Sequence, residues 1–302
     1  MPEPRTPPSW LLPRANRSIA TDRPLIMGIL NVNDDSFCGD GTLEATGVAD
    51  QTRALLEAGA DIIDVGAESA RTNRQAVPVD EEIRRFQLFF DVWHDVMKDW
   101  QPHQNDALSP PLLSLNTWRH QVVEAILPLG GDLLNDMSGP ANQANARACA
   151  RHGVSLLVMH TVGEPKQAQT DRQWQDVVAD VEGFFEQSLA RATACGLPRE
   201  AVVLDPGLDF AKQKEDNLEL MRHLPRLTRF ERPILLPVSR KTFIGETLGL
   251  DNPLDRDPGT LACIAAAMIA ADSGWVFRVH NVPAARAACR MLHAVAHPKS
   301  AD

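Results

Sequence analysis

Short apolar runs alternate with longer mixed stretches along the chain from Leu25 onward. The apolar runs cover residues 25–31, 61–67, 112–117, 132–138, 155–160, 201–207, 233–239 and 275–281. Each is a near-continuous hydrophobic segment, which is typical of parallel strands buried on both faces. The stretches between them predict helices, for example over residues 44–58, 80–98, 119–129, 171–195 and 283–296.

Eight such strand–helix units predict a single (β/α)8 TIM barrel over residues 25–302, because about 250 residues is the usual size of that fold. An open, doubly wound sheet is the alternative, but the glycine-rich phosphate turns GxGxxG and GxxxxGK[ST] do not occur. The first 24 residues contain six prolines and one short apolar cluster at 10–12. They predict a flexible, Pro-rich N-terminal arm with no secretory signal.

Polar residues collect at the carboxyl end of almost every predicted strand. In chain order they are Asn31, Asp64 with Glu68, Asn116, Asn135 with Asp136, His160, Asp205, residues 239–241, and Arg278 with His280. In a (β/α)8 barrel these ends converge on one face, where active sites are built, so we expect a shared site. The alternative is that strand ends become polar simply because they leave the core.

Some of these side chains indicate a chemistry. Asp205 precedes a Pro-Gly turn, and a partly buried carboxylate there favours a ligand edge that presents N–H groups, unless it only caps the turn. Lys241, Arg278 and His280 could gather around an anionic ligand, or pair with carboxylates such as Asp257. On residue type alone, His160 and Met159 read as core or rim residues, and no metal-binding spacing is present.

The charge balance narrows the classes of partner. The chain carries 30 Lys and Arg against 40 Asp and Glu, a net charge of −10 with no basic block, which disfavours nucleic-acid binding through phosphate contacts. Its apolar runs fall short of the ~20 residues that span a bilayer, so no membrane partner is expected. Five scattered cysteines without a CxxC indicate reduced thiols and predict a cytoplasmic location.

Six ordered motifs carry a resemblance to a known family. They are IMGILNVNDDSF (26–37), GADIIDVGAESAR (59–71), LLNDMSG (133–139), LDPGLDFAK (204–212), VSRKTFIG (238–245) and RVHNV (278–282). From about residue 25 to about 295 the chain resembles dihydropteroate synthase, a pterin-binding barrel enzyme of folate synthesis. The resemblance implies condensation of 6-hydroxymethyl-7,8-dihydropterin diphosphate with 4-aminobenzoate and release of diphosphate. It also implies a homodimer.

The resemblance implies a role for each matching position. Asp205 and Asn135 would bind the aminopyrimidine edge of the pterin, and Lys241 would contact its ring. The diphosphate would be held by Arg71, Arg278 and His280, together with Asn31 and a bridging Mg²⁺. Lys241, Arg278, His280 and Arg71 are thus the implied catalytic residues and Asn31 the metal ligand, while the further substrate-binding positions are Asn116, Met159, Phe210, Ala70 and Thr242.

The chain departs from the family pattern mainly on the amine-acceptor side. Asn33 and Asp34 replace Thr-Pro, Ala70 and Thr72 replace Thr and Pro, and Asn116, Asp209 and Asn281 replace Asp, Gly and Asp. Asn116 removes a charge beside the pterin, and a negative Asp209 would disfavour a carboxylated amine unless it points away. The alternative function is therefore a pterin-binding paralogue that uses a different amine acceptor or lacks synthase activity.

Overall fold

Eight parallel strands close into a barrel in the computed structural model, which describes residues 7–33, 41–68, 75–102, 107–138, 143–163 and 172–296. The barrel strands are β3 (Leu25–Asn31), β4 (Ile62–Gly66), β5 (Leu112–Asn116), β6 (Leu133–Asp136), β7 (Ser155–Met159), β8 (Val202–Asp205), β9 (Ile234–Leu236) and β10 (Trp275–Val279). Each pairs with its neighbour in the chain, and β10 closes the ring on β3. Each lies within one of the predicted apolar runs, so the predicted TIM barrel is confirmed.

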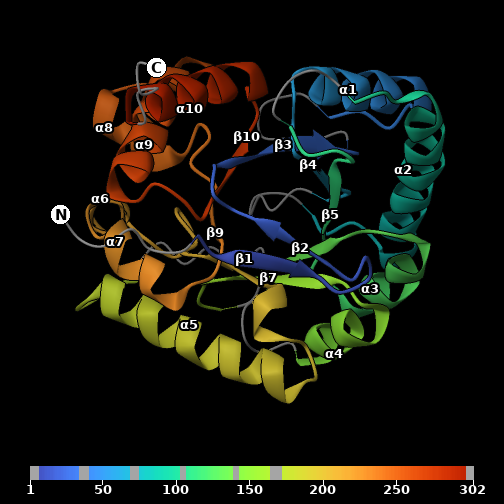
Figure 1. The fold of residues 1–302 in the computed structure, drawn as a ribbon, viewed down its shortest axis with the longest axis horizontal. Coiled ribbons are helices and arrows are strands. Elements are labelled where there is room, and N and C mark those ends of the chain that lie inside the picture. The colour runs from blue at the N-terminus through green and yellow to red at the C-terminus, as the bar shows by residue number, and fades with distance from the viewer. Residues whose placement is uncertain are drawn as a thin grey trace, which may run out of the picture.

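Helices surround this ring (Figure 1). The α-helices are α1 (Ala45–Glu57), α2 (Val79–Asp99), α3 (His120–Ile126), α4 (Gln143–His152), α5 (Val177–Ala194), α6 (Lys214–Arg222), α7 (Leu224–Leu227), α8 (Thr242–Leu248), α9 (Asp257–Ala270) and α10 (Val282–Ala296). Short 3-10 turns lie at Leu127–Leu129, Arg199–Ala201, Thr228–Phe230 and Pro253–Arg256. The helix predicted over 119–129 is divided at its end, because Pro128 cannot continue the α-helical hydrogen bonds.

The apolar side chains form two layers. One cluster fills the barrel interior with residues from alternate strand positions, such as Met27, Ile62 and Leu133. The larger cluster lies between the barrel and the helices and includes Phe86 and Phe185. Because both faces of each strand are covered, the strands are apolar at nearly every position, and a polar side chain inside the barrel stands out.

The predicted flexible arm is wrong for residues 9–20, which form a β-hairpin of β1 (Ser9–Leu12) and β2 (Arg17–Ala20). Trp10 is fully buried, and its Nε1 donates to Ser155 Oγ at the start of β7 (3.1 Å). Leu12 and Ile19 pack into the interior cluster beside it. The hairpin therefore closes the amino end of the barrel, because its few apolar side chains find buried positions there.

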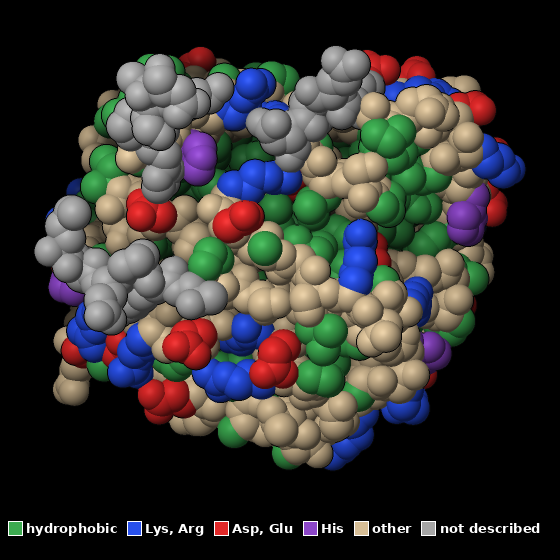
Figure 2. Space-filling model, viewed as in Figure 1, with side chains coloured by type: hydrophobic (Ala, Val, Ile, Leu, Met, Phe, Trp, Pro, Cys, Tyr) green, Lys and Arg blue, Asp and Glu red, His purple; other side chains and the backbone are tan. Residues whose placement is uncertain are grey.

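The hairpin lies across the middle of the ring of helices in Figure 1. Acidic and basic side chains are interspersed on the face seen from that side, as Figure 2 shows. Among the described helices, none combines the length and apolar composition that crossing a membrane requires.

Candidate active site

The carboxylate of Asp64 joins four strands of the barrel near their carboxyl ends. The residue lies in β4 and is 0% exposed. It accepts hydrogen bonds from Arg278 Nε on β10 (2.7 Å) and from Ser114 Oγ on β5 (2.5 Å). The side-chain amides of Asn135 and Asn116 donate to it at 3.1 and 3.3 Å. Predicted site residues from β5, β6 and β10 thus converge on Asp64, whose position at a strand end was noted but whose central role was not predicted.

Asp205 and Lys241 form the second part of the site. Asp205 is 3% exposed at the end of β8 and accepts a hydrogen bond from Gly207 N (2.7 Å). Burial raises the pKa of Asp205 to about 6, although Gly207 N and the cations of Lys241, Lys212 and Arg278 oppose this. Burial likewise lowers the pKa of Lys241, against the attraction of Asp209 and Asp205. A carboxylate and an ammonium held in this way suit a polar ligand that presents both hydrogen-bond donors and acceptors.

The ammonium of Lys241 is oriented by the turn that follows β8. Its Nζ donates to Leu208 O at 2.9 Å and lies 4.7 Å from the centre of the Phe210 ring. Met159, at the end of β7, is 3% exposed and pairs in register with Asp205. The structure therefore brings Lys241, Phe210, Met159 and Asp205 together at one part of the barrel mouth.

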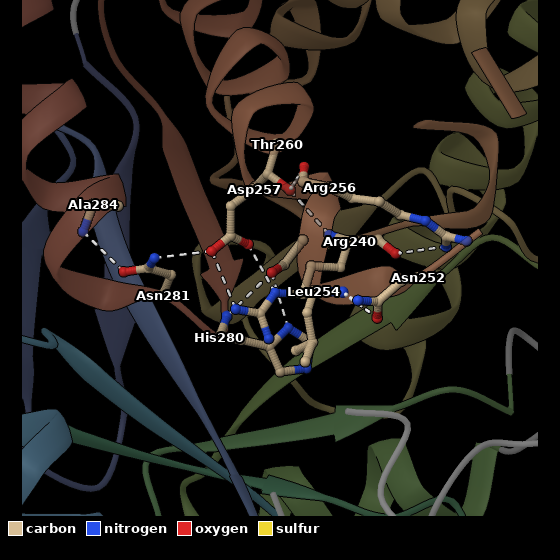
Figure 3. Close-up of polar contacts among 10 residues, drawn as sticks. Arg240, Asn252, Leu254, Arg256, Asp257, Thr260, His280, Asn281 and Ala284 are labelled. Atoms are coloured by element: carbon tan, nitrogen blue, oxygen red, sulfur yellow. Dashed lines mark hydrogen bonds and ion pairs between the residues drawn. The ribbon is translucent and has the colours of Figure 1, made fainter. Parts of the chain in front are cut away.

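His280 belongs to a polar cluster between β10 and α9 (Figure 3). Its Nδ1 lies 2.9 Å from Ser239 Oγ, which also accepts a hydrogen bond from His280 N. Asp257 binds the guanidinium of Arg240 at 2.7 and 3.1 Å and the amide of Asn281 at 2.9 Å. The bond from Arg240 lowers the pKa of Asp257. Asp257, the carboxylate suggested from the sequence as a partner for the cations of the site, is thus bound to Arg240, a residue that the sequence analysis did not single out.

Two other carboxylates at the strand ends bind the surrounding structure. Asp136 accepts from Ser138 and from Asn145 Nδ2 (2.8 Å), and burial raises its pKa to about 6. Asp136 follows the inward-facing Asn135, and successive strand residues point to opposite faces of the sheet. Glu68 pairs with Arg119 and accepts from Val77 N (3.0 Å). Some polar residues at the strand ends therefore face the barrel mouth, while others face the layer of helices and bind residues there.

Asp209 directs its carboxylate towards the start of α8. Its backbone has φ +65°, a left-handed conformation that Asp tolerates better than most residues. Asp209 Oδ2 accepts from Thr242 N at 2.5 Å, and Oδ1 accepts from Asn217 Nδ2 at 3.2 Å. Two of the substitutions that set this chain apart from its family pattern, Asp209 and Asn116, are therefore each bound to a neighbouring residue.

The remaining predicted residues are placed as follows. Asn31 ends β3 beside Gly66 of β4, at the barrel mouth. Thr242 is exposed and begins α8. Arg71 and Ala70 lie outside the described residues, so their positions stay predictions. His160 is 1% exposed, which confirms its interpretation as a core histidine.

A (β/α)8 barrel that presents buried acceptors and cations at one mouth is typical of an enzyme with a polar, partly anionic small-molecule substrate. The sequence model of the family "Pterin binding enzyme" matches residues 27–280, so the chain belongs to the pterin-binding enzymes. Within them it is a member of the dihydropteroate synthase family. It is 32% identical to the dihydropteroate synthase of Escherichia coli K12, over 93% of this chain and 95% of that protein.

Two further relatives bear on the site. The chain is 36% identical to inactive dihydropteroate synthase 2 of Mycobacterium tuberculosis, over 92% of this chain and 85% of that protein. It is similar to the solved structure of Xanthomonas albilineans dihydropteroate synthase with 4-aminobenzoic acid, with a TM-score of 0.80 and 31% identity. That likeness covers 96% of this chain and 99% of the other.

Proposed function

We propose that this protein is a dihydropteroate synthase, which condenses 6-hydroxymethyl-7,8-dihydropterin diphosphate with 4-aminobenzoate and releases diphosphate. The observation that carries the proposal is the convergence of Asp64, Asn135 and Asp205 at one barrel mouth in a chain of this family. The aminopyrimidine edge of a pterin offers several N–H donors. Buried carboxylates are the acceptors that such an edge requires.

The reaction needs charge neutralisation rather than a covalent nucleophile. Cleavage of the C–O bond to diphosphate leaves a cationic methylene that the pterin ring stabilises; the aniline nitrogen then attacks that carbon and loses one proton. Arg278 and His280 would bind the diphosphate, and Arg278 is held in place by Asp64. Lys241 would contact the pterin ring from its place above Phe210. We assign Arg71 to the diphosphate as well. Positioning and electrostatic stabilisation are then the main contributions of the protein.

Mg²⁺ fits this site only as an ion shared with the substrate. Within the described residues, no group of three or more His, Cys, Asp or Glu side chains could hold a metal. Mg²⁺ bound to phosphates commonly takes one or two protein oxygens, and Asn31 at the end of β3 offers an amide oxygen. We propose that Asn31 supplies this ligand and that the ion, when bound, neutralises charge on the leaving diphosphate.

The proposal is tested by measuring diphosphate release from the pterin diphosphate with Mg²⁺ and 4-aminobenzoate. We expect release that depends on both substrates, together with formation of dihydropteroate by mass spectrometry. The Arg278→Gln variant lacks the cation for the leaving group and should not release diphosphate; because it also leaves the buried Asp64 without its ionic partner, its folding is checked by circular dichroism. No release at high enzyme concentration would contradict the proposal.

A second candidate is a pterin-binding paralogue with a different amine acceptor or with no synthase activity. It is supported by the 36% identical relative that is named an inactive synthase, and by two substitutions in this chain. Asp209 places a negative charge at the first turn of α8, and Asn116 takes a position that carries Asp in the family pattern. Both changes would weaken binding of a carboxylated aniline or of the pterin.

The two candidates are separated by the ranking of amines in the same assay. A neutral amide of 4-aminobenzoate that outcompetes 4-aminobenzoate would favour the second candidate, and Asp209→Gly should then restore preference for the acid. Tight calorimetric binding of the pterin diphosphate without turnover of any aniline would favour a binding protein. Recovery of turnover in Asn116→Asp would locate the defect at Asn116.

We also propose a homodimer in the cytoplasm. α9 is apolar around most of its circumference, and Ile269 on α9 and Met291 on α10 are 81% and 65% exposed. A helix that is apolar on nearly all sides is usually covered, and a second copy would cover it. Light scattering of Ile269→Glu should show monomers. A reducing compartment is supported by the free thiols of all four cysteines in the described ranges and is tested by cell fractionation.

A further inference from the structure

Lys212 is a nearly buried lysine just beyond the turn that carries Phe210. The residue is 7% exposed, and burial lowers its pKa to about 7. The three nearest acceptors of its Nζ are His160 Nδ1 at 2.8 Å, Gly207 O at 2.9 Å and Phe210 O at 3.1 Å, and His160 O lies farther away at 3.4 Å. An ammonium group has three protons to donate, so these acceptors satisfy it and offset the cost of its burial. Two of the three are carbonyls of the turn itself.

The histidine in this set acts as an acceptor. His160 Nε2 lies 3.1 Å from Asp180 Oδ1, on α5, and burial lowers the pKa of His160 to about 4. The imidazole is therefore neutral, with its proton on Nε2 facing Asp180 and its lone pair on Nδ1 facing Lys212. This assignment follows from the two partners, since only one nitrogen of a neutral ring carries a proton.

The turn to which Lys212 is hydrogen-bonded has several residues in the left-handed backbone conformation. Gly207, Asp209 and Ala211 have φ values of +66°, +65° and +53°. Residues other than glycine adopt this region at a conformational cost, and they persist there where surrounding contacts determine the path of the chain. Besides Lys212, Trp174 Nε1 donates to Ala211 O (2.8 Å) and Asp209 N donates to Asn217 Oδ1 (2.8 Å).

The same turn orients the groups that face the ligand. Its Gly207 N binds Asp205, and its Leu208 O accepts from Lys241 Nζ at 2.9 Å. The Phe210 ring lies 4.7 Å from that Nζ. Lys212 binds the carbonyls of Gly207 and Phe210, which lie before and after Leu208 in the chain. Its contacts therefore fix the turn on both sides of the carbonyl that binds Lys241.

We propose that Lys212 is a positioning residue, whose Nζ hydrogen bonds hold the 207–210 turn in the conformation that orients Lys241 and Asp205 towards the pterin. Lys212 itself touches no ligand in this scheme. The claim that this orientation serves pterin binding rests on the function proposed above. The claim that Lys212 fixes the position of Lys241 does not depend on that function.

The test compares Lys212→Met with Lys214→Met. Methionine keeps most of the volume of lysine but donates no hydrogen bond. Lys214 is a nearby lysine whose side chain is 39% exposed at the start of α6, which makes it the matched control. The first readout is the rate of reductive methylation of Lys241 in the folded protein, measured by mass spectrometry with the exposed Lys98 as internal reference. The second is the affinity for 6-hydroxymethylpterin, measured by calorimetry.

In Lys212→Met we expect methylation of Lys241 to rise and pterin affinity to fall, each by about 10- to 100-fold, as for loss of a hydrogen bond made by a charged group. Lys214→Met should stay within about twofold of the parent protein, since exposed side chains outside a network contribute little. A rise in methylation without any pterin binding in the parent protein would support the positioning role and contradict the proposed function.

A folded Lys212→Met protein with unchanged methylation of Lys241 would overturn the proposal, even if its melting temperature is lower. Such a result would make Lys212 a purely structural residue. If circular dichroism shows that Lys212→Met does not fold, Lys212→Gln provides the milder perturbation, because it keeps a polar donor but is too short to reach the acceptors of the lysine Nζ in the same way. The same rise in methylation would support the proposal, and no change would overturn it.

Discussion

Asn116→Asp replaces one amide nitrogen by a carboxylate oxygen at the centre of the site and should have a large, pH-dependent effect on the free energy of unfolding. In the parent protein, Asn116 Nδ2 donates to Asp64 Oδ2 at 3.3 Å, and Arg278 Nε donates to the same oxygen at 2.7 Å. The variant replaces a donor by a second acceptor that carries a negative charge. Asp64 is fully buried, so water cannot screen the pair efficiently.

The magnitude follows from the distance between the two side chains. Two unit charges 3.3 Å apart repel by about 5 kcal/mol at an effective dielectric constant of about 20. The lost hydrogen bond adds about 1 kcal/mol. The guanidinium of Arg278 attracts the new carboxylate and offsets part of this, so we expect a net loss of about 2–4 kcal/mol in the free energy of unfolding at pH 8.

Urea denaturation at pH 8 and at pH 5 measures this loss, with Asn116→Ala as the control that removes the amide without adding charge. The loss in Asn116→Asp should shrink at pH 5, because the new carboxyl group then takes up a proton and donates to Asp64. The loss in the Ala variant should be about 1 kcal/mol and independent of pH. Equal stability of the Asp variant and the parent at pH 8, or an equal loss at both pH values, would refute the reasoning.

Three further changes test other parts of the molecule. Burial raises the pKa of the Asp205 carboxyl group to about 6 from an ordinary 3.8, a difference worth about 3 kcal/mol. Asp205→Asn removes this group, so it should raise the free energy of unfolding in urea at pH 8 by up to about 3 kcal/mol. It should give no gain below pH 4, where the parent carboxyl group is protonated in both states. The parent protein should lose pterin affinity in calorimetry as pH falls through 6, and Asp205→Asn should bind weakly throughout. Lys241→Ala should weaken pterin binding by about 10- to 100-fold with an unchanged circular dichroism spectrum, and unchanged affinity would contradict its role. Trp10→Ala should cost about 3–5 kcal/mol in urea, against less than about 1 for the half-buried Leu11→Ala, and equal losses would contradict the packing of the hairpin.

The barrel could be predicted from the sequence because its strands are buried on both faces. Apolar runs of six or seven residues leave few alternatives when eight of them alternate with helix-like stretches along the chain. The hairpin could not be predicted in the same way. Its buried side chains, Trp10, Leu12 and Ile19, are too few to show a period, and their partner Ser155 lies 145 residues away from Trp10. Only the closed barrel creates the surface that orders them.

The site was predictable to the level of strand ends and no further. Asn135 and Asp136 are adjacent, and the sequence does not say which of them faces the barrel. The structure turns Asn135 towards Asp64 and Asp136 towards Asn145. Lys212 was missed because a single lysine after a turn is normally exposed. Its role depends on the directions of the carbonyl groups in the turn, which are set by positive φ values. Among residue types, only glycine predicts such φ values from sequence.

Asp209 shows how far a substitution can be interpreted from its residue type. The family pattern has glycine there, and the backbone keeps the left-handed φ of +65° that glycine adopts freely. Aspartate can follow that path because its short side chain turns back to bind backbone N–H groups, here that of Thr242. The sequence predicts a negative charge near the amine acceptor, and the structure binds that charge to the first N–H of α8. A carboxylated acceptor would therefore meet a carboxylate already hydrogen-bonded there, so Asp209→Gly is the substitution expected to separate the two proposed functions.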